Sequence, residues 1–600
     1  MAEPRVRVPG VEARAGKFPG PSLIPALNAI QERVGWLPRA ELVALSHDVH
    51  RPLYEIEGLI SFYPHFRTEP PKPVEVRVCH DLTCWLRGGE AKIAALRERY
   101  GADADVALVE GSCLGRCDIA PACTVDEAPV AMDDAAVAVE AARAAASSAV
   151  GHSHNGHAGH NGRAAPAPVA AWPNDPYPTE NDRYALVREV LGGRRDTAGI
   201  IAALKDSGLR GMGGAGFLAG RKWDMVAAQP ATPRYVICNA DESEPGTFKD
   251  RQILATQPHL VLEGMLLGML AVGAEEAWVF IRHEYGPEEQ VIRAEIERLR
   301  NEELIGPTVF AGNTDAGTGR RLDIEVFTSP GGYILGEESA LLECMEGHRG
   351  EPRNKPPFPA AYGLHGKPTL MNSVETFAHV PVIALRGADW WNAQGAPSAV
   401  GAAHAGLKFF AVSGHVERPG VYCVPMGTTA RELLALAGGV SDGRELGAIQ
   451  PGGASSNFIG PDQLDVELDF GTLQAADSML GSGALVVMAK GTDLLAAAVN
   501  VLRFFRDESC GKCVPCRVGS TKSHQMLTDL LASGGGPADV SADVRELVDV
   551  MRRTSICGLG QVALGPVSSV IKLSARPGDI AGGGSADEHG DSANGGRHEG

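Results

Sequence analysis

The chain has 600 residues, of which 44% are hydrophobic, and this is more than a single core usually organises, so we expect several domains. Its formal net charge is −19. This charge argues against a polyanionic partner, because phosphate backbones are bound by a surplus of lysine and arginine, and we expect no nucleic-acid ligand.

The sequence shows no sign of a membrane span or a secretory signal. Its apolar stretch at 260–279 is interrupted by Glu263, Glu275 and Glu276, and no uncharged run reaches the roughly 20 residues that a spanning helix needs. The N-terminus carries basic residues but no apolar segment with a cleavage site. We expect a cytoplasmic protein without a membrane span of its own.

Residues 1–140 are expected to form a small α/β domain. Helical periodicity runs through 21–64, and a strand-like segment, VEVRVC at 74–79, precedes an amphipathic helical segment, KIAALRERY. Residues 141–174 are rich in Ala, His and Pro, a composition that cannot form a core, and are expected to be a linker. Its histidines are metal-ligand candidates that lack a scaffold: His152, His154, His157 and His160.

Three further folded regions follow the linker. Residues 175–400 alternate helical segments with short strands such as RYVICNA and AWVFI, which predicts a large α/β domain. Residues 401–490 hold short strands around one helix, ARELLALAGG, as in a compact α+β module. Residues 491–576 are predicted to be helical, and the Gly-rich polar tail 577–600 is predicted to be disordered.

Eight of the twelve cysteines fall into two spaced groups, and in a reducing compartment such thiols are more often metal ligands than disulfides. The first group is Cys79-x4-Cys84 and, after a gap of 28 residues, Cys113-x3-Cys117. One thiol pair per iron suits a two-iron cluster. A zinc clip is the alternative, in which Cys123 replaces a ligand only if the loop is unusual.

The second group is Cys510-x2-Cys513-x2-Cys516, with a fourth thiol 41 positions further on at Cys557. Four soft ligands, three of them at two-residue gaps, suit a cubane cluster that is wrapped at one corner by a loop. Structural zinc is the alternative, although zinc sites usually come as two paired C-x2-C arms. The other four thiols are expected to be small buried hydrophobic side chains: Cys123, Cys238, Cys344 and Cys423.

A glycine run, Gly211-Met-Gly213-Gly214-Ala-Gly216-Phe217, has the spacing G-x-G-x-x-G. The signal is weak by itself, because a helix (TAGIIAALKDSG) precedes it where the dinucleotide motif requires a strand. Backbone without side chains can nevertheless approach a phosphate or a flavin ring closely, and its amides supply donors. A tight turn without a ligand is the alternative.

Two acidic segments support a nucleotide site. They are CNADESEPGTFKDR at 238–251 and SPGGYILGEESALLECMEGHRGEPRNKPPFP at 329–359. Carboxylates beside glycines at such sites usually accept hydrogen bonds from ribose hydroxyls and repel a 2′-phosphate, which favours NAD over NADP. Either segment taken singly is also compatible with an ordinary exposed acidic loop.

Together these motifs carry a resemblance. GLRGMGGAGF with RKW, CNADESEPGTFKDR, GGYILGEESALL, KPPFP and ESCGKCVPCR resemble the NADH-binding, 51-kDa-type flavoprotein subunit of respiratory complex I, over roughly residues 180–575. The first 140 residues, with Cys79, Cys84 and CLGRC, resemble its 24-kDa-type partner. The resemblance implies a multidomain α/β protein: an N-terminal thioredoxin-like ferredoxin domain, a Rossmann-like FMN/NAD domain, a ubiquitin-like (β-grasp) SLBB domain and a C-terminal helical bundle.

The family implies four cofactors, namely FMN, NAD, a 2Fe-2S cluster and a 4Fe-4S cluster. Gly216 belongs to the glycine loop, Lys222 is a candidate for the flavin phosphate, and Phe217 would stack on the nicotinamide or adenine. Glu244 and Lys355 would contact NAD and Phe358 would flank it, with Glu244 and Glu338 nearest the hydride transfer. The residues expected to surround FMN are Gly211, Gly213, Gly214, Asn239, Asp241, Tyr333, Gly336, Glu337, Glu338 and Asn372.

Four positions depart from the family pattern. Met212 stands where Arg is common, which removes a cation near the phosphates. Leu335 stands where Cys is common, His283 where Gly is common and Ser373 where Asn is common. None of the four removes a cluster ligand.

The resemblance implies hydride transfer between NADH and FMN, followed by single-electron transfer to the cluster at Cys510 to Cys557. Catalysis is then mostly positioning, because the cofactors carry the chemistry. The chain has no cysteines left for further clusters, so we expect a catalytic iron-sulfur partner subunit. Because the two subunits are fused here, the favoured partner is the alpha subunit of an NAD-dependent formate dehydrogenase. A hydrogenase small subunit and the 75-kDa-type subunit of complex I are the other candidate partners.

Two alternatives from other classes remain at this point. An electron-relay scaffold would keep the fold without nucleotide turnover, although the intact glycine and acidic motifs speak against it. A zinc-stapled binding protein would be colourless when purified.

Overall fold

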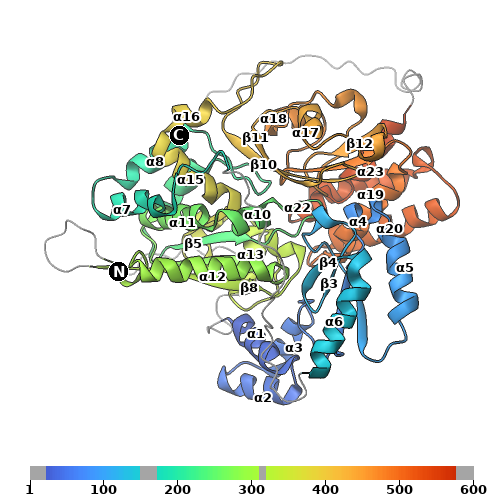
Figure 1. Ribbon diagram of the computed structural model, residues 1–600, viewed down its shortest axis with the longest axis horizontal. Coiled ribbons are helices and arrows are strands. Elements are labelled where there is room, and N and C mark those ends of the chain that lie inside the picture. The colour runs from blue at the N-terminus through green and yellow to red at the C-terminus, as the bar shows by residue number, and fades with distance from the viewer. Residues whose placement is uncertain (1–21, 149–171, 310–318, 576–600) are drawn as a thin grey trace, which may run out of the picture.

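The computed structural model describes residues 22–148, 172–309 and 319–575, as three sheets and a helical end region (Figure 1). The tail 577–600 and the four linker histidines lie outside the described residues, so the predictions made for them stay predictions, as do the domain boundaries. All twelve cysteines are free thiols.

The described N-terminal part, 22–148, carries six α-helices and a mixed four-stranded sheet in the order β2-β1-β3-β4. Strand β1 pairs parallel with β2 and antiparallel with β3. Val74, Val76 and Val78 of β1 are fully buried, as the alternation in VEVRVC predicts. The elements are α1 (Leu23–Val34), α2 (Arg39–Asp48), α3 (Leu53–Ile60), β1 (Val74–Cys79), α4 (Leu82–Leu86), α5 (Gly89–Tyr100), β2 (Val106–Gly111), β3 (Ala122–Val125), β4 (Ala128–Ala131) and α6 (Ala135–Ser148).

The central domain is built on a five-stranded sheet in the order β7-β8-β6-β5-β9. Strands β8, β6, β5 and β9 are parallel, and β7 is an antiparallel edge strand. The strands are β5 (Tyr235–Ala240), β6 (Glu276–Arg282), β7 (Gly306–Val309), β8 (Arg320–Ser329) and β9 (Thr369–Ser373). The helices are α7 (Ala185–Leu191), α8 (Thr197–Asp206), α9 (Ala219–Ala227), α10 (Lys249–Thr256), α11 (Pro258–Val272), α12 (Gly286–Asn301), α13 (Glu338–Met345), α14 (Pro359–Tyr362), α15 (Val374–Arg386) and α16 (Ala388–Asn392).

Helix α11 is the core helix of this domain and packs against α15. A Cβ at Gly264 would lie 2.1 Å from the carbonyl oxygen of Phe377, so the two helices approach as closely as only glycine allows. No single helix in the described part of the chain is long and apolar enough to cross a membrane. The pair α10 and α11 passes by length and composition, but it is bent by 93°, and almost every residue of α11 is buried within the protein.

A third sheet, in the order β11-β10-β13-β12, forms the compact module that follows. Its elements are β10 (Leu407–Gly414), β11 (Gly420–Pro425), α17 (Ala430–Leu436), β12 (Leu446–Gln450), α18 (Phe470–Ala475) and β13 (Ala484–Ala489). The C-terminal region is helical, as predicted. It comprises α19 (Leu494–Asp507), α20 (Val514–Ala532), α21 (Ala542–Thr554), α22 (Gly558–Val562) and α23 (Gly565–Ser574).

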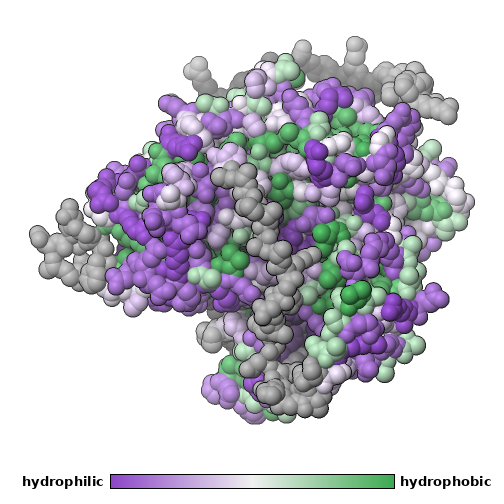
Figure 2. All heavy atoms as spheres, in the orientation of Figure 1, coloured by the Kyte–Doolittle hydropathy of each residue, from purple (hydrophilic) through white to green (hydrophobic). Residues whose placement is uncertain are grey.

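The surface of the central domain is strongly polar over α12. Hydrophilic side chains predominate over this helix in the space-filling view (Figure 2). They include ion pairs one turn apart, with Arg293 2.6 Å from Glu289 and Arg298 2.8 Å from Glu302. Such pairs are typical of a solvated helix face.

The four regions meet around the loop after β2 and the segment of β1 and α4. Arg116 of the loop after β2 makes a buried two-pronged ion pair with Glu288 of the central domain, at 2.9 and 3.0 Å. Thr83 of α4 lies 3.1 Å from Ser413 of β10, hydroxyl to hydroxyl. Asn500 of α19 donates to the carbonyl oxygen of the residue after Cys79, at 3.0 Å. The N-terminal sheet is therefore docked on the other three regions at once.

Candidate functional site

The four N-terminal cysteines come together in one buried cluster. Cys79 ends β1, Cys84 lies in α4, and Cys113 and Cys117 lie on the loop after β2. The Cys113 and Cys117 sulfurs are 3.7 Å apart. The hydrogen bond with Cys113 is the main cause that raises the pKa of the Cys79 thiol, and a second bond, with Cys84, adds to it. The thiols therefore interact as one group.

Backbone amides point at these sulfurs. Gly115 donates its N–H to the Cys113 sulfur at 3.5 Å, and Ala122 donates to the Cys84 sulfur at 3.4 Å. The hydrogen bond from Cys117 is the main cause that lowers the pKa of the Cys113 thiol. Buried thiols that share charge and accept amide hydrogen bonds are the donor set that a two-iron cluster requires, so the residues present fit a 2Fe-2S cluster.

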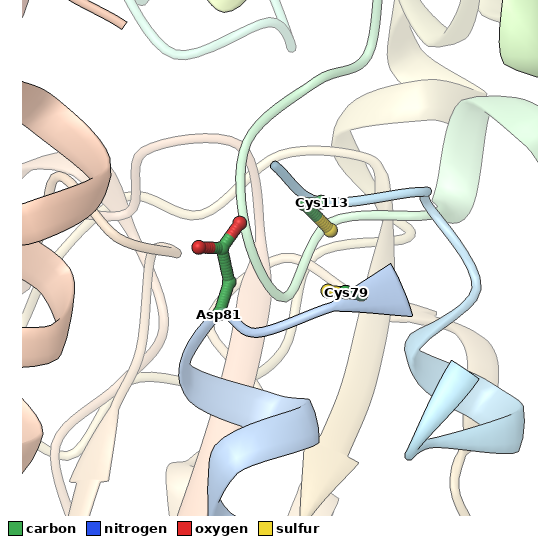
Figure 3. A group of neighbouring side chains, drawn as sticks. All are labelled: Cys79, Asp81 and Cys113. Atoms are coloured by element: carbon green, nitrogen blue, oxygen red, sulfur yellow. The ribbon is translucent and has the colours of Figure 1, made fainter. Parts of the chain in front are cut away.

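Asp81 adds a carboxylate to the edge of this cluster. One of its oxygens and the sulfurs of Cys79 and Cys113 all lie within 4.8 Å of one another (Figure 3). Asp81 is buried, and among the described residues neither of its oxygens has a hydrogen-bond partner. Burial raises the pKa of this carboxyl well above its usual range, and the neighbouring Cys113 raises it further.

The four C-terminal cysteines line a single small cavity. Cys513 immediately precedes α20, Cys516 lies in the first turn of that helix, and Cys557 immediately precedes α22. Only Cys516 of the four is fully buried. Four thiols around one cavity fit a 4Fe-4S cluster. The other lining residues are Ile334, Pro352, Ser509, Lys512, Ile556 and Leu559.

A short 3₁₀ turn, Tyr333–Gly336, separates this cavity from the predicted nucleotide site. Ile334 of the turn lines the cavity, while the phenol of Tyr333 lies near Glu244. The Tyr333 ring packs edge-on against Phe504 of α19, with 4.9 Å between the ring centroids. The turn therefore belongs to both sites.

The glycine loop closes on itself. The Gly211 amide donates to the Phe217 carbonyl at 2.8 Å. Gly216 has φ +65°, and a Cβ there would lie 2.8 Å from the ring of Phe470, so this position requires glycine. A Cβ at Gly213 would lie 3.2 Å from that of Ser373. Helix α8 precedes the loop, so this is not the strand-turn-helix arrangement of the dinucleotide motif, as the sequence predicts.

The carboxyl ends of β5 and β9 bring the other predicted flavin residues together. The chain runs from β5 through β6 to β8 on one side and returns to β9 on the other, so a topological switch point lies between β5 and β9. The Asn239 side chain donates to the Gly336 carbonyl at 2.8 Å. Asp241 accepts from the Ser329 hydroxyl at 2.9 Å, and burial raises its pKa to about 6.

Asn372 of β9 lies beside Cys238 of β5, across the switch point. Its side-chain amide accepts from the Trp223 indole N–H at 2.9 Å and donates to the Met371 carbonyl at 2.9 Å in the orientation that satisfies both groups. Ligand crevices of parallel α/β sheets lie at such points.

Two lysines and two glutamates lie next to one another beside the loop. The Lys355 ammonium is 2.6 Å from Glu337 and 3.0 Å from Glu338. Lys222 lies 3.9 Å from Glu338 and donates to a backbone carbonyl at 3.0 Å. Burial lowers the pKa of Lys222, as expected for a cation removed from water.

Glu337 has a second role, because its other oxygen accepts from the backbone N–H groups of Ser339 and Ala340 and caps α13. Phe217 and Phe358 are 43% and 54% exposed, which is unusual for large aromatic side chains. Exposed aromatic faces, cations and side-chain-free backbone fit a flavin and a dinucleotide.

The structure adds residues that sequence patterns did not single out. Thr376 accepts from the Met212 amide at 2.9 Å and so supports the glycine loop. Ser455 donates its backbone N–H to Glu244 at 2.7 Å. Arg282 donates to the Glu242 carbonyl at 2.6 Å and so ties β6 to the acidic loop. No local pattern marks these residues, because their partners lie far away in the sequence.

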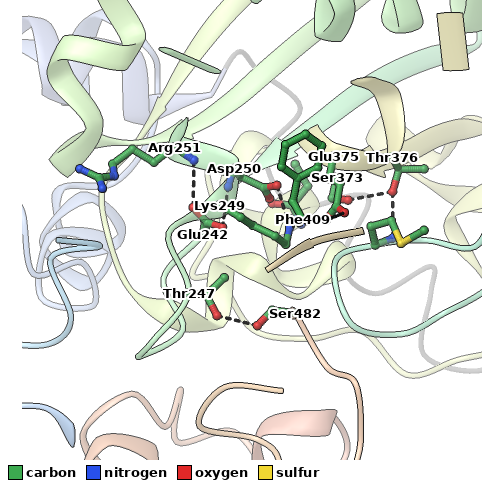
Figure 4. Close-up of polar contacts among 12 residues, drawn as sticks. Glu242, Thr247, Lys249, Asp250, Arg251, Ser373, Glu375, Thr376, Phe409 and Ser482 are labelled. Carbon is green, nitrogen blue, oxygen red and sulfur yellow. Dashed lines mark hydrogen bonds and ion pairs between the residues drawn. The ribbon is translucent and has the colours of Figure 1, made fainter. Parts of the chain in front are cut away.

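A buried charge network lies beneath the acidic loop (Figure 4). Glu375 lies 2.9 Å from Lys249 and 2.7 Å from Lys408, and accepts from the Phe409 amide at 2.9 Å. The cations Lys249 and Lys408 are the main causes that lower the pKa of the Glu375 carboxyl, against the opposing effect of burial. This network joins the central domain to β10.

The departures from the family pattern have structural partners. The Met212 side chain is buried in the core. It therefore provides no charged group at the surface of the loop. His283 packs on His65 at a centroid distance of 4.2 Å. The Ser373 hydroxyl bonds Thr376 at 2.9 Å.

Comparisons with known proteins agree with this geometry. The family model for the Nuo51 FMN-binding domain matches residues 204–382, and that for the thioredoxin-like [2Fe-2S] ferredoxin matches 16–142. The SLBB domain matches 409–455, and the NADH-ubiquinone oxidoreductase-F iron-sulfur binding region matches 496–574.

Relatives share most of their length with this chain. The HndC subunit of the NADP-reducing hydrogenase of Solidesulfovibrio fructosivorans is 40% identical over 375 residues, 62% of this chain and 74% of that protein. The F subunit of the NADH-quinone oxidoreductase of Mycobacterium bovis is 41% identical over 377 residues, 62% of this chain and 82% of that protein. A solved chain of an NAD⁺-reducing [NiFe]-hydrogenase in the air-oxidized state has a TM-score of 0.77 at 30% identity, covering 93% of both chains.

The fold and the site therefore define an NAD(P)H-oxidising flavoprotein and iron-sulfur module. The chain belongs to the family of the F-type flavoprotein subunits of NADH-quinone oxidoreductases and hydrogenases, with a thioredoxin-like ferredoxin domain fused in front. Its cofactors are FMN, NAD, a 2Fe-2S cluster and a 4Fe-4S cluster.

Proposed function

We propose that this chain is the NAD-reducing subunit of a formate dehydrogenase, exchanging electrons with a catalytic iron-sulfur subunit. The main support for electron exchange between a nucleotide and a cluster is the 3₁₀ turn at 333–336, which borders both the proposed nucleotide site and the cavity of Cys510 to Cys557. The fused ferredoxin domain favours an NAD-reducing assembly, because it places both cluster sites and the nucleotide site on one chain.

A hydrogenase diaphorase subunit is the second candidate. It is favoured by the likeness to the chain of the NAD⁺-reducing [NiFe]-hydrogenase, which extends over 93% of both chains and includes the fused arrangement. A complex I subunit is the third, since the curated NADH-quinone oxidoreductase subunit matches 62% of this chain.

The residues of the nucleotide site bind and orient the cofactors. Bound FMN supplies the chemistry, exchanging a hydride with NAD(H) and single electrons with the clusters. Phe217 would stack on the nicotinamide or adenine, Phe358 would flank the NAD, and Lys355 and Lys222 would supply cations. FMN would be surrounded by Gly211, Gly213, Gly214, Asn239, Asp241, Tyr333, Gly336, Glu337, Glu338 and Asn372, with Gly216 in the same glycine loop.

The carboxylates set the preference for NAD over NADP in this proposal. Glu244 is held in place by the Ser455 amide, and Glu337 and Glu338 lie within 3.0 Å of Lys355. Carboxylates held in place accept from ribose hydroxyls and repel a 2′-phosphate. Met212, which stands where Arg is common in the family, supplies no cation that would offset that repulsion.

The partner is tested by purifying the chain anaerobically with its associated subunits and measuring NAD⁺ reduction with formate and, separately, with H₂. We expect reduction with formate and none with H₂. Reduction with H₂ alone would replace the proposal by the hydrogenase candidate. Reduction with neither, from a preparation in which NADH bleaches the flavin, would leave the complex I candidate.

The site assignment is tested by Phe217→Ala. We expect the KM for NADH to rise about tenfold while FMN content is unchanged, because the lost contact is to the dinucleotide. Tyr54→Ala is the matched control, since Tyr54 is an exposed aromatic residue on α3. Equal kinetics for the two variants would remove Phe217 from the site.

A further inference from the structure

One side chain contacts all three cofactor-bearing segments. Glu508 follows α19 and lies two residues before Cys510. One of its carboxylate oxygens accepts from the hydroxyl of Ser112, the residue before Cys113. The other oxygen accepts from the backbone N–H of Tyr333 at 2.7 Å. A single carboxylate thus joins the ferredoxin loop, the shared turn and the C-terminal cysteine loop.

The local geometry leaves room for this contact. Gly332 has φ +112°, which turns the chain toward Glu508, and the nearest heavy atom to a Cβ there would be the Glu508 carboxylate at 4.0 Å. An ionised carboxylate only accepts hydrogen bonds, so it suits two donors that approach from different segments. Hydrogen bonds to charged acceptors are shorter and stronger than neutral ones.

The ferredoxin loop has other fixed contacts besides this clamp, the pair of hydrogen bonds that Glu508 accepts from Ser112 and Tyr333. The Arg282 side chain, which belongs to the central domain, donates a hydrogen bond to the Cys113 carbonyl at 2.7 Å. Two further ties of the ferredoxin loop, Arg116 to Glu288 and Asp118 to Arg251, also run to the central domain. The Ser112–Glu508 bond instead ties this loop to the segment that carries Cys510.

We propose that Glu508 is a positioning residue that sets the spacing between the two cysteine clusters and the turn at 333–336, and so the rate at which electrons from the flavin reach the ferredoxin cluster. The proposal rests on the proposed function for its kinetic consequence. Its structural part, the contact with the Tyr333 amide and the Ser112 hydroxyl, stands without it.

The test uses Glu508→Met and Ser112→Ala in the holoprotein. Methionine keeps the length of the side chain and removes both carboxylate oxygens, so the Tyr333 amide and the Ser112 hydroxyl both lose their acceptor. Glutamine would not serve, because its oxygen can accept from the amide while its N–H groups donate to the serine hydroxyl. Ser112→Ala removes one bond and leaves the carboxylate. Glu546→Met, at an exposed glutamate on α21, is the control.

The first readout is hydrogen exchange at the Tyr333 amide, which does not depend on activity. We expect exchange to accelerate at least about tenfold in Glu508→Met, because an amide exchanges once its acceptor is lost. Glu546→Met should match the unaltered protein. Unchanged exchange in Glu508→Met would overturn the clamp.

The second readout separates positioning from a general structural defect. In Glu508→Met we expect FMN content, dithionite-reducible cluster content and the rate of flavin bleaching by NADH to change by less than about twofold. Freeze-quench EPR should show the 2Fe-2S signal rising severalfold more slowly after NADH is added, with Ser112→Ala intermediate, because a displaced cluster loop lengthens the path between the cofactors. The double variant should be no slower than Glu508→Met, since both changes remove the Ser112–Glu508 bond.

Loss of flavin and cluster in parallel with the slower signal would assign Glu508 a purely structural role and overturn the proposal. An unchanged rise of the 2Fe-2S signal would overturn it as well. If NADH fails to bleach the flavin of the unaltered protein, the proposed function fails instead, and the Tyr333 amide still decides whether the clamp exists.

Discussion

The two cysteine clusters differ in how the protein surrounds them. All four N-terminal thiols are buried where the N-terminal sheet meets three other regions, whereas three of the four C-terminal thiols are only half-buried. Val514, next to Cys513, is 58% exposed, and Val78, next to Cys79, is fully buried. Because solvent exposure and hydrogen bonds to sulfur tune cluster potentials, we expect the buried N-terminal (inner) cluster and the half-buried C-terminal (outer) cluster to differ in potential.

The largest expected effect is on the ion pair that docks the inner cluster. Arg116→Ala leaves the buried Glu288 carboxylate without its partner, and breaking such a pair costs about 3–5 kcal/mol. Denaturant unfolding followed by loss of the 2Fe-2S absorbance measures it. Arg552→Ala, which breaks an exposed Arg–Asp pair beside the outer cluster, should change stability by less than about 0.5 kcal/mol.

Two glycines in the cluster loops sharpen the comparison. Gly115 has φ +66°, and its Cβ would lie 2.5 Å from the Tyr285 hydroxyl, so Gly115→Ala should cost about 2–4 kcal/mol from backbone strain plus overpacking. Gly511 has φ +76°, but the nearest atom to its Cβ would be 3.8 Å away. Gly511→Ala should therefore cost only about 1–2 kcal/mol. Equal losses in calorimetric unfolding would contradict the difference in packing.

Two valines beside cluster cysteines test burial directly. Val78→Ala removes two methyl groups from a fully buried position and should cost about 2 kcal/mol. Val514→Ala should stay within about 0.5 kcal/mol, since the side chain is largely exposed. Urea titration of the two variants against the unaltered protein measures both values, and a large loss for Val514→Ala would mean that the outer cluster is buried as well.

The smallest expected effect concerns iron release. In air with an iron chelator, the 4Fe-4S cluster should be lost about tenfold faster than the 2Fe-2S cluster, because oxidation of thiolate ligands follows their exposure. EPR of dithionite-reduced aliquots follows each cluster over time. Faster loss of the 2Fe-2S signal would reverse the comparison.

Spacing patterns predicted much of this protein correctly. The strand at 74–79, the helix before the glycine run and the helical end region appear as predicted, because each follows from local periodicity. The cofactors follow from cysteine and glycine spacing combined with the family resemblance, and the family comparisons confirm them.

The sequence by itself determined which residues form each cysteine group and that a glycine loop and two acidic segments accompany them, because ligand spacing and turn chemistry are local properties. Only the tertiary structure decided that β5 with Asn239 and β9 with Asn372 lie side by side at a switch point, that Arg116 pairs with Glu288, and that Glu508 joins Ser112 to Tyr333. These contacts span many tens to hundreds of residues. Which distant partners meet depends on how the sheets and helices pack, and no local pattern encodes that.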